Sequence, residues 1–398
     1  MTPPILFFDI SRLIRRYENF GGPTGIDRVE VQYAAWLARQ RVFEPVAVTR
    51  SRAGLVAVSP ASFRVVMDEL NRRWQADVPP GFGREHRSAV RFLAERVHGR
   101  LARWRLLAGA RAPETGGRPS VYLNVGQDGL DTPQNYASLP GARAALIHDV
   151  IPLTHPEYDT ARAVTLHGRR VAALAGHFDH VITNSEATRH DLLAQIDGPP
   201  RFSSATAYLA PALVASPAPA RFDAPTFVHL STINRRKNLA LLLHVWKSFA
   251  GLDDAPRLAI IGRRGNDGTA LELLDRCAAL KPLVTFHGAL NDTDAAPIVA
   301  GARALLTPSF AEGFGLPIVE AHAMGVPVIA SDLPAHREIG GAMTPYLDPL
   351  DGPAWRETIL AFARDNELHE RQRAAIRPPA RWEDHFASVE PTLLALAR

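Results

Sequence analysis

The sequence predicts an α/β fold in which two doubly wound domains face a cleft. Short apolar runs that resemble buried strands alternate with segments of helical periodicity along most of the 398 residues. The alternation stops once, at residues 198–226, where proline, alanine and serine are frequent, and it then starts again. We therefore expect an N-terminal domain over 1–197, a linker and hinge over 198–226, and a C-terminal domain over 227–378.

The N-terminal half begins with an apolar run at residues 5–10, which predicts a strand, followed by a polar loop that contains glycine. Apolar residues from Ile26 to Leu37 then repeat at helical spacing, and Thr24 with Asp27 resembles a capping box at the start of that helix. Further strands are expected at 121–125, 144–148 and 180–184, with a helix over 161–174. Such alternation is typical of a parallel sheet covered on both faces.

The C-terminal half repeats the pattern. Strands are expected at 227–231, 258–261, 284–287, 303–307 and 326–330, and helices at 239–249, 271–280, 295–300 and 317–324. In doubly wound sheets, ligands bind at the carboxyl ends of the strands, where loops lead into helix N-termini.

Composition, apolar runs and cysteine content exclude several classes of protein. Hydrophobic residues make up 46% and charged residues 22% of the chain, which is ordinary for a folded soluble protein. No apolar run reaches the roughly 18 residues of a membrane span, and the N-terminus lacks the basic region of a secretory signal. Cys277 is the single cysteine, so the chain has no internal disulfide and no thiolate pair for zinc. We expect a cytoplasmic location.

The segment from Arg84 to Arg118 departs from this plan, since it holds nine arginines and three glutamates. Its basic and apolar residues alternate roughly as in a helix. A solvated helical face, or a basic amphipathic helix on the anionic inner face of the cytoplasmic membrane, fits this pattern. Nucleic-acid binding is disfavoured, because no base-stacking motif accompanies the charge.

Residues 308–320 are the most informative segment. They follow a predicted strand and open a helix with Pro317 in its first turn, while Gly313 and Gly315 let the backbone approach a ligand closely. The free amides of the helix start predict an anion site. Glu312 and Glu320 flank it and would repel phosphate, so we expect them to accept hydrogen bonds from hydroxyl groups, such as those of a ribose and a sugar.

The stretch Glu312-Gly-Phe-Gly-Leu-Pro-Ile-Val-Glu320, with residues 321–340 after it, resembles the retaining nucleotide-sugar glycosyltransferases of family 4. Their hallmark is two glutamates separated by seven residues. The resemblance implies a GT-B fold, a nucleotide-diphosphate sugar as co-substrate, and no cofactor or metal. It assigns the donor ribose to Glu320 and the donor sugar to Glu312. The residues between them that it places at the donor are Gly313, Phe314, Gly315 and Leu316.

A second patch, residues 228–238, ends the first strand of the C-terminal domain. Arg236 and Lys237 are suited to neutralise a diphosphate leaving group as its charge builds. Lys237 matches the phosphate-binding lysine of the family. Some members have an arginine where Thr232 stands, so both Arg235 and Arg236 are candidates for the second positive charge.

In the N-terminal domain, His148 and Asp149 end a predicted strand. A histidine in such a place is by itself more often structural. The resemblance instead implies that His148 faces the donor sugar and the reaction centre, and that Asp149 orients it or contacts the acceptor. Asn184 and Ser185 match a stretch that lines the cleft.

Two further features of the family have counterparts here. The loop from Gly21 to Arg28, with Gly25, resembles the glycine-rich loop near the donor phosphates. Residues 379–398 resemble a terminal helix that crosses back to the first domain, in which Trp382 is expected to pack.

The resemblance therefore implies a retaining hexosyltransferase with His148, Glu312 and Lys237 at the reaction. It favours GDP-mannose or a related GDP-sugar, with UDP- and dTDP-sugars as alternatives, and a lipid-linked or growing glycan of a bacterial surface polysaccharide as acceptor. Two other classes stay open. A glycoside hydrolase would use Glu312 and Glu320 as its carboxylate pair, and a nucleotide-sugar-binding subunit would lack turnover.

Overall fold

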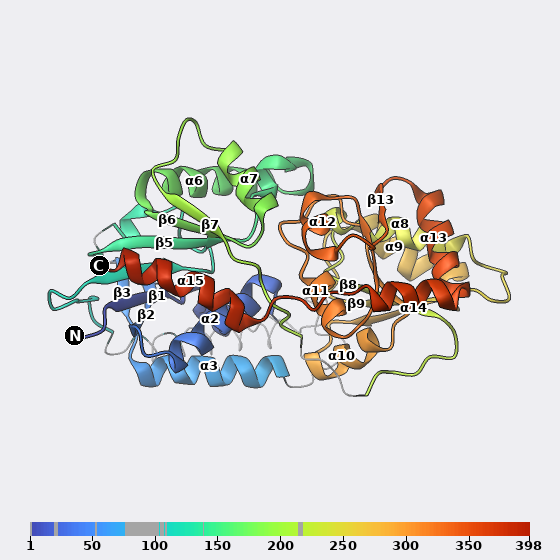
Figure 1. The fold of residues 1–398 in the computed structure, drawn as a ribbon, viewed down its shortest axis with the longest axis horizontal. Coiled ribbons are helices and arrows are strands. Elements are labelled where there is room, and N and C mark those ends of the chain that lie inside the picture. Colours follow the sequence, from blue (N-terminus) through green and yellow to red (C-terminus); the bar gives the residue numbers. More distant parts are fainter. Residues whose placement is uncertain are drawn as a thin grey trace. The chain divides into compact units, whose positions relative to one another are not determined.

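The computed structural model describes residues 2–19, 23–51, 54–75, 103, 107, 110–137, 139–213 and 218–398, and these form two compact units (Figure 1). Unit 1 contains the described residues up to Trp74, those from 103 to Leu209, and Ala380–Arg398. Unit 2 contains Ala210–Pro379. The change from one unit to the other after Leu209 lies inside the stretch 198–226 that was expected to be a linker.

Unit 1 is built on a seven-stranded sheet in the order β3-β2-β1-β4-β5-β6-β7. Neighbouring strands are parallel except at one edge, where β2 and β3 are antiparallel. The strands are β1 (Ile5–Asp9), β2 (Glu44–Ser51), β3 (Gly54–Ala57), β4 (Ser120–Asn124), β5 (Ala142–Ile147), β6 (His180–Thr183) and β7 (Ser203–Thr206). The main helices are α1 (Ser11–Asn19), α2 (Gly25–Arg39), α3 (Pro60–Gln75), α5 (Ile151–Thr154), α6 (Ala161–His177), α7 (Glu186–Ala194) and α15 (Trp382–Leu396).

Unit 2 carries a six-stranded sheet, parallel throughout, in the order β10-β9-β8-β11-β12-β13. Its strands are β8 (Thr226–Leu230), β9 (Arg257–Ile261), β10 (Val284–Gly288), β11 (Ala304–Thr307), β12 (Val328–Ser331) and β13 (Tyr346–Leu347). Its helices are α8 (Leu239–Lys247), α9 (Gly268–Arg276), α10 (Asp292–Ala300), α11 (Leu316–Ala323), α12 (Pro334–Gly340), α13 (Gly352–Arg364) and α14 (Asn366–Ala374). The predicted α/β fold with two doubly wound sheets is confirmed.

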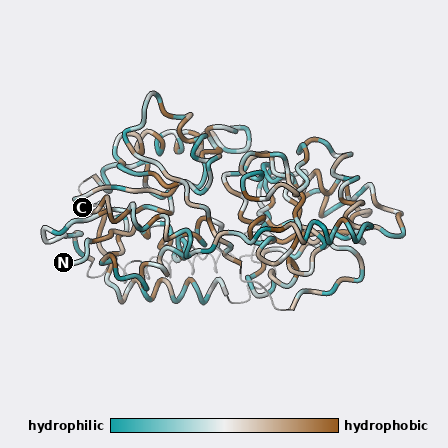
Figure 2. Tube along the Cα trace, in the orientation of Figure 1, coloured by the Kyte–Doolittle hydropathy of each residue, from teal (hydrophilic) through white to brown (hydrophobic). Residues whose placement is uncertain are grey.

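Both faces of the unit 2 sheet are buried, because successive residues of one strand enter different apolar clusters. In β11, Leu306 packs in the cluster of α8, α9 and α13, whereas Leu305 packs in the cluster of α10 and α11. Phe227 and Val228 divide in the same way in β8. The near-continuous apolar runs of these strands thus reflect burial on two sides, and brown segments in the interior of Figure 2 follow them.

The structure adds elements that the sequence analysis did not predict. Residues expected to form a polar loop after β1 include helix α1, whose Leu13 and Ile14 are buried. The antiparallel pair β2 and β3 was also missed, and β7 lies within the stretch expected to be a linker, where it pairs with β6. The strands β3 and β7 have four residues each, and the pairing of β7 with β6 joins residues more than 20 positions apart in sequence.

The C-terminal helix α15 packs on unit 1 (Figure 1). The Phe386 ring stacks on Trp36 of α2 with centroids 4.7 Å apart, and His385 Nε2 lies 2.8 Å from the Tyr33 hydroxyl. Trp382 takes part in the same aromatic cluster, 5.8 Å from Phe386. A segment that follows unit 2 in the chain therefore completes the core of unit 1.

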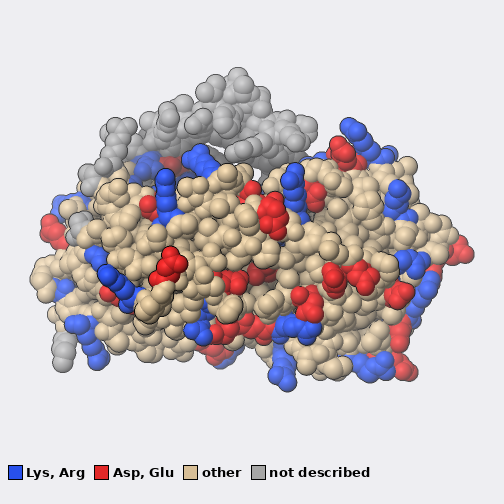
Figure 3. All heavy atoms as spheres, turned by 90° about the horizontal axis from the view of Figure 1, so that it is seen from above, with Lys and Arg blue, Asp and Glu red and all other residues tan. Residues whose placement is uncertain are grey.

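Charge is spread thinly over the surface. The formal net charge is +4, and basic and acidic side chains are interspersed on the face seen in Figure 3. Most of the Arg84 to Arg118 segment lies outside the described residues. Of its nine arginines, Arg103, Arg111 and Arg118 are described. The Arg103 guanidinium donates to the Arg50 carbonyl at 3.0 Å and pairs with Glu18 at 3.1 Å, and Arg118 pairs with Glu44.

Candidate functional site

The centre of the unit 2 sheet is the point at which the strand order reverses, between β8 and β11. Both strands point the same way, so the loops after them leave the same edge of the sheet. One loop leads through residues 235–237 into α8, and the other leads through residues 308–315 into α11. Such a reversal point is where ligands of doubly wound sheets bind.

The loop after β8 is held from both sides. Asn234 caps the short helical turn Arg235–Lys237 by accepting from the Lys237 backbone N–H at 3.1 Å. Asn238 then adopts a left-handed conformation with φ of 54°, and its side-chain amide donates to the Pro349 carbonyl at 2.8 Å. Gly262 lets the neighbouring loop approach, because a Cβ there would lie 1.7 Å from the Ser231 oxygen. The turn is therefore rigidly placed.

Lys237 and Arg236 converge on Glu312 from the neighbouring loop. The Lys237 ammonium and the Ser309 hydroxyl donate to Glu312 Oε1, the latter at 2.7 Å, and Arg236 Nη1 donates to Oε2 at 2.9 Å. Only 8% of the Glu312 side chain is exposed. Burial alone would raise its pKa, but the two cations outweigh burial and hold the pKa of Glu312 well below its usual value. Glu312 is thus a charged hydrogen-bond acceptor at neutral pH.

Arg236, rather than Arg235, occupies this cluster, while Arg235 is exposed. The Arg236 guanidinium also donates to the Ala311 carbonyl, and its backbone carbonyl accepts from Phe310 N–H at 2.8 Å. These contacts fasten the two loops together. Among the candidates for the second positive charge, the geometry brings Arg236 next to Lys237.

The loop from Gly313 to Gly315 turns sharply into α11. Gly315 precedes the helix with φ of 103°, and a Cβ there would lie 3.3 Å from the His336 ring and 3.2 Å from Ile339. Phe314 is buried, and Leu316 begins the helix. Glu320 lies on the second turn of α11 and is 6% exposed. At this helix start the Leu316 N–H is the amide suited to an anion, because Pro317 has no N–H and the Ile318 N–H donates to the Gly315 carbonyl at 2.9 Å.

Two buried histidines near these loops were missed by the sequence analysis. His229 in β8 bridges the Leu306 carbonyl and the Ser231 hydroxyl, at 3.0 and 2.8 Å. His336 Nδ1 donates to the Ser331 carbonyl at 2.9 Å. Burial lowers the pKa of both, to about 4 for His229, so both are neutral at pH 7. His229 lies near the end of β8 and His336 in α12, the helix that follows β12, and position close to a strand end is the signal that marks such residues.

In unit 1, His148 follows β5 and is 5% exposed. Its Nε2 lies 3.0 Å from the Val125 carbonyl, which only accepts, so Nε2 carries the proton and Nδ1 keeps a lone pair. Burial lowers the pKa of His148 to about 4, and Arg12 adds to the effect. His148 is therefore a neutral imidazole at pH 7.

Three further candidates, Asp149, Asn184 and Ser185, lie at or next to the strand ends around His148. Asn184 Nδ2 donates to the His148 carbonyl at 2.9 Å, and Asp149 Oδ1 accepts from the Ile151 N–H at 3.2 Å. The Ser185 hydroxyl caps α7 by accepting from Thr188 N–H at 2.9 Å. The structure thus brings together the four candidates of this part of unit 1.

Gly25 is the first residue of α2. Before it, Thr24 donates its backbone N–H and its hydroxyl to Asp27 Oδ2, both at 2.7 Å, so the helix starts where the capping box predicted. Gly21 and Gly22 lie outside the described residues.

Within the part of the chain that the structure describes, no group of three or more His, Cys, Asp or Glu is placed to hold a metal ion. Searching those residues for a helix both long and apolar enough to cross a bilayer finds none.

Comparison with known proteins adds to this geometry. Residues 224–365 match the family model "Glycosyl transferases group 1". The chain is 32% identical over 145 residues to O-antigen chain mannosyltransferase B of Escherichia coli, covering 36% of this chain and 38% of that protein. It is 31% identical over 143 residues to the phosphatidyl-myo-inositol mannosyltransferase of Mycobacterium leprae, covering 35% and 37%. The matches thus span less than two fifths of these relatives' length.

Solved structures match over nearly the whole chain. Anabaena HepE, crystallised with UDP and glucose, matches with a TM-score of 0.65 at 16% identity, covering 99% of this chain and 100% of that one. A sucrose-phosphate synthase from Thermosynechococcus elongatus matches with a TM-score of 0.60 at 17% identity, covering 99% of each. At these identities the likeness concerns the fold, which is GT-B-like. The matched residues 224–365 include the Lys237 and Glu312 loops, so this part of the chain resembles a glycosyl transferases group 1 domain.

Proposed function

We propose that the protein is a retaining glycosyltransferase that moves a hexosyl group from a nucleotide-diphosphate sugar to a lipid-linked or growing glycan. The observation that carries the proposal is the cluster of Lys237, Arg236 and Glu312 at the reversal point of the unit 2 sheet. Two cations and a helix N-terminus are suited to a diphosphate, and a charged carboxylate beside them is suited to sugar hydroxyls.

In this proposal each residue of the donor site has a role. Lys237 and Arg236 stabilise the diphosphate as it leaves, together with the Leu316 N–H at the start of α11. Gly313, Phe314, Gly315 and Leu316 bring the backbone close to the donor, with Gly25 as a further candidate in unit 1. Glu320 accepts from the ribose hydroxyls and Glu312 from those of the sugar. No metal is needed, because the protein supplies the positive charge.

The reaction breaks the bond between the anomeric carbon and the diphosphate oxygen and forms one to the acceptor hydroxyl on the same face. The acceptor proton passes to the departing phosphate. Neutral His148 is suited to hydrogen-bond the donor sugar near the reaction centre, since its Nδ1 keeps a lone pair. Asp149 and Asn184 hold the loop that carries it, and Ser185 caps the neighbouring helix α7.

Mannose is the sugar we propose, with GDP-mannose as donor, because the relatives described above are named as mannosyltransferases. O-antigen synthesis by the first of them supports a surface polysaccharide as the product and the cytoplasmic face of the membrane as the place of reaction. HepE was crystallised with UDP and glucose, which keeps UDP-sugars, and likewise dTDP-sugars, as alternative donors.

The electrostatics of Glu312 would leave it only the role of the ionised carboxylate in a glycoside hydrolase. The acid of such a pair needs a raised pKa so that it is protonated at work. Glu312 has the opposite property, since Lys237 and Arg236 hold its pKa low. A nucleotide-sugar-binding subunit without turnover would keep this site, and only an assay of transfer separates it from the enzyme.

The testing experiment has two stages. Thermal unfolding is measured with GDP, UDP, dTDP and ADP in turn, and a ligand bound by the folded state raises the midpoint. We expect GDP to give the largest shift. The protein is then incubated with radiolabelled GDP-mannose and a membrane extract that contains lipid-linked glycan, and label is followed into the lipid fraction. Absence of any shift together with absence of transfer would refute the proposal.

A further inference from the structure

The reversal point of the unit 1 sheet lies between β1 and β4, and it carries a second polar cluster. Strands β2, β1 and β4 are parallel neighbours, so Arg50 near the end of β2, α1 after β1, and the turn after β4 share one edge of the sheet. Doubly wound sheets bind ligands at this place. The proposed function assigns Gly25, at the start of α2, to the donor, and assigns no role to the arginines of this cluster.

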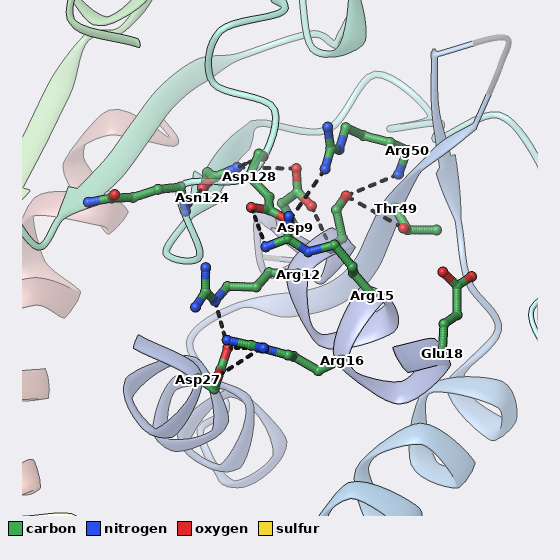
Figure 4. Close-up of polar contacts among 12 residues, drawn as sticks. Asp9, Arg12, Arg15, Arg16, Glu18, Asp27, Thr49, Arg50, Asn124 and Asp128 are labelled. Carbon is green, nitrogen blue, oxygen red and sulfur yellow. Dashed lines mark hydrogen bonds and ion pairs between the residues drawn. The ribbon is translucent and has the colours of Figure 1, made fainter. Parts of the chain in front are cut away.

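Arginine side chains dominate the cluster (Figure 4). Arg15 from α1 and Arg50 from β2 point toward Asp128 in the turn after β4, at 3.0 and 3.5 Å. Arg12 and Arg16, one turn apart on α1, converge on Asp27 of α2, at 2.6 and 2.9 Å.

A fifth arginine, Arg170 of α6, interacts electrostatically with Arg12, Arg15, Asp128 and Asp131. Five arginines therefore stand near four aspartates, Asp9 (Figure 4), Asp27, Asp128 and Asp131, and burial raises the pKa of Asp9. Glu30, also inside the cluster, does not balance them, because burial raises its pKa well above the usual value. The cluster carries surplus positive charge in a place where burial makes repulsion costly.

Several hydrogen-bond donors of the cluster lack an acceptor. Among the described residues, Arg50 Nε, Arg170 Nε and Gln127 Nε2 are buried without a partner. Gln127 is 5% exposed and sits in the turn with a positive φ of 61°. Gly129 lets Arg50 lie against that turn, since a Cβ there would be 2.6 Å from Arg50 Cδ. The Glu30 carboxyl oxygens are likewise buried without a partner. Buried polar groups normally find partners, so these three donors and one carboxyl mark a cluster whose hydrogen bonding is incomplete.

The accessible parts of the arginines face solvent. The side chains of Arg15 and Arg50 are 49% and 32% exposed, whereas that of Asp128 is 5% exposed. The 3.5 Å contact between Arg50 and Asp128 lies at the limit of a hydrogen bond, so Arg50 loses little by turning to another acceptor. An incoming anion would meet guanidinium groups before it meets the carboxylate.

We propose that this arginine cluster, with Arg15 and Arg50 as its accessible members, binds a phosphoryl group of a phosphate ester or diphosphate. Guanidinium groups bind phosphoryl oxygens through paired, charge-assisted hydrogen bonds. The inference deepens the proposed function and rests on it for the source of the anion, which is either the donor diphosphate or a phosphate of the lipid-linked acceptor.

The test measures inorganic pyrophosphate binding to the full-length protein by calorimetry. Arg15→Gln/Arg50→Gln should weaken binding by about tenfold or more, because each substitution removes a charge-assisted hydrogen bond. Arg72→Gln, which removes an exposed arginine paired with Glu69 on α3, is the matched control and should bind as the wild type does. Since Arg15 is half exposed, Arg15→Gln alone carries the test if the double variant unfolds early in a thermal melt. Unchanged pyrophosphate affinity in folded arginine variants would overturn the proposal.

Two further arms identify the source and separate this inference from the proposed function. Lys237→Met should leave pyrophosphate binding at the arginine cluster within about threefold of wild type, whereas loss of all binding in this variant would overturn the cluster as the site. If the anion belongs to the donor, Arg15→Gln/Arg50→Gln also weakens GDP binding. If it belongs to the acceptor, GDP binding is unchanged and the KM for lipid-linked glycan rises. Pyrophosphate binding at the arginines without any nucleotide binding would refute the proposed function alone.

Discussion

Lys237→Met removes the ammonium group that lies against Glu312 and keeps most of the volume of the side chain. Lys237 and Glu312 are 14% and 8% exposed, so little solvent screens the pair. After the substitution Glu312 still accepts from Arg236 at 2.9 Å and from Ser309 at 2.7 Å. The carboxylate therefore loses one of three donors and does not become an isolated buried charge.

The expected loss of stability follows from the number of hydrogen-bond donors that Glu312 keeps. Stripping a buried carboxylate of its partner costs about 3–5 kcal/mol, whereas losing one charge-assisted hydrogen bond costs about 1.5–3 kcal/mol. Because Arg236 remains, we expect the lower range for the free energy of unfolding at pH 7. Binding of GDP should weaken by at least about tenfold, since the same ammonium group serves the diphosphate in the proposed function.

The pH dependence of the free energy of unfolding tests the sign of the electrostatic effect of Lys237 on Glu312. Burial raises the pKa of Glu312 but Lys237 and Arg236 lower it well below the usual 4.5, so the stabilisation is present above pH 4.5 and disappears as pH falls through the folded-state pKa. In Lys237→Met that pKa rises. The difference in stability between wild type and variant should therefore be constant near pH 7 and shrink below pH 4.5.

Urea unfolding of both proteins between pH 3 and about pH 8 measures this difference. The chain has two other lysines, and Lys247→Met on the exposed side of α8 is the control, expected to change stability by less than about 0.5 kcal/mol. Equal stability of Lys237→Met and wild type at pH 7, or an equal difference at all pH values, would refute the electrostatic argument.

Three other predictions follow from the same structure. Gly315→Ala should lower the free energy of unfolding, measured in urea, by about 1–3 kcal/mol and weaken GDP binding, because φ is 103° and the new Cβ meets His336 and Ile339. The control Gly325→Ala, which has open space around its Cβ, should cost about 1 kcal/mol in the same assay. Phe386→Ala should lower the free energy of unfolding by about 3 kcal/mol, because the stack on Trp36 is lost. The control Phe222→Ala, at an exposed ring, should change it little, and equal changes in the two variants would contradict the packing of α15 on unit 1. Turnover that needs neutral His148 should be independent of pH between about 6 and 8 and fall as pH approaches 4, and a decline already at pH 7 would contradict the burial that lowers its pKa.

Local patterns were enough to predict which loops follow strands of unit 2. The glycines, the proline and the two glutamates lie within nine residues of the loop before α11 and of α11 itself, and Lys237 lies in the loop after β8. What the sequence did not predict is that Glu312 and Lys237 form an ion pair. They are 75 residues apart, and their contact depends on β8 and β11 being neighbours at the reversal point.

Unit 1 was harder to predict because its polar side chains come from dispersed positions. Arg12, Arg50 and Asp128 belong to no short motif, and the abundance of arginine in the chain gives none of them special weight. Helix α1 was read as a loop, so its arginines were not recognised as one face. Only the strand order β2-β1-β4 brings these residues to one edge.

Both sheets carry a charged cluster at the point where their strand order reverses, but the balance of positive and negative charge differs between the two clusters. In unit 2, Glu312 offsets part of the charge of Lys237 and Arg236, so a diphosphate there must compete with a carboxylate already bound. In unit 1, the arginines exceed the ionised carboxylates, and buried donors lack acceptors. If both sites bind phosphoryl groups, the unit 1 site should depend more steeply on salt, because its outer arginines, Arg15 and Arg50, are more exposed than Lys237 and Arg236. Titration of pyrophosphate at increasing salt in wild type, Lys237→Met and Arg15→Gln/Arg50→Gln separates the two contributions.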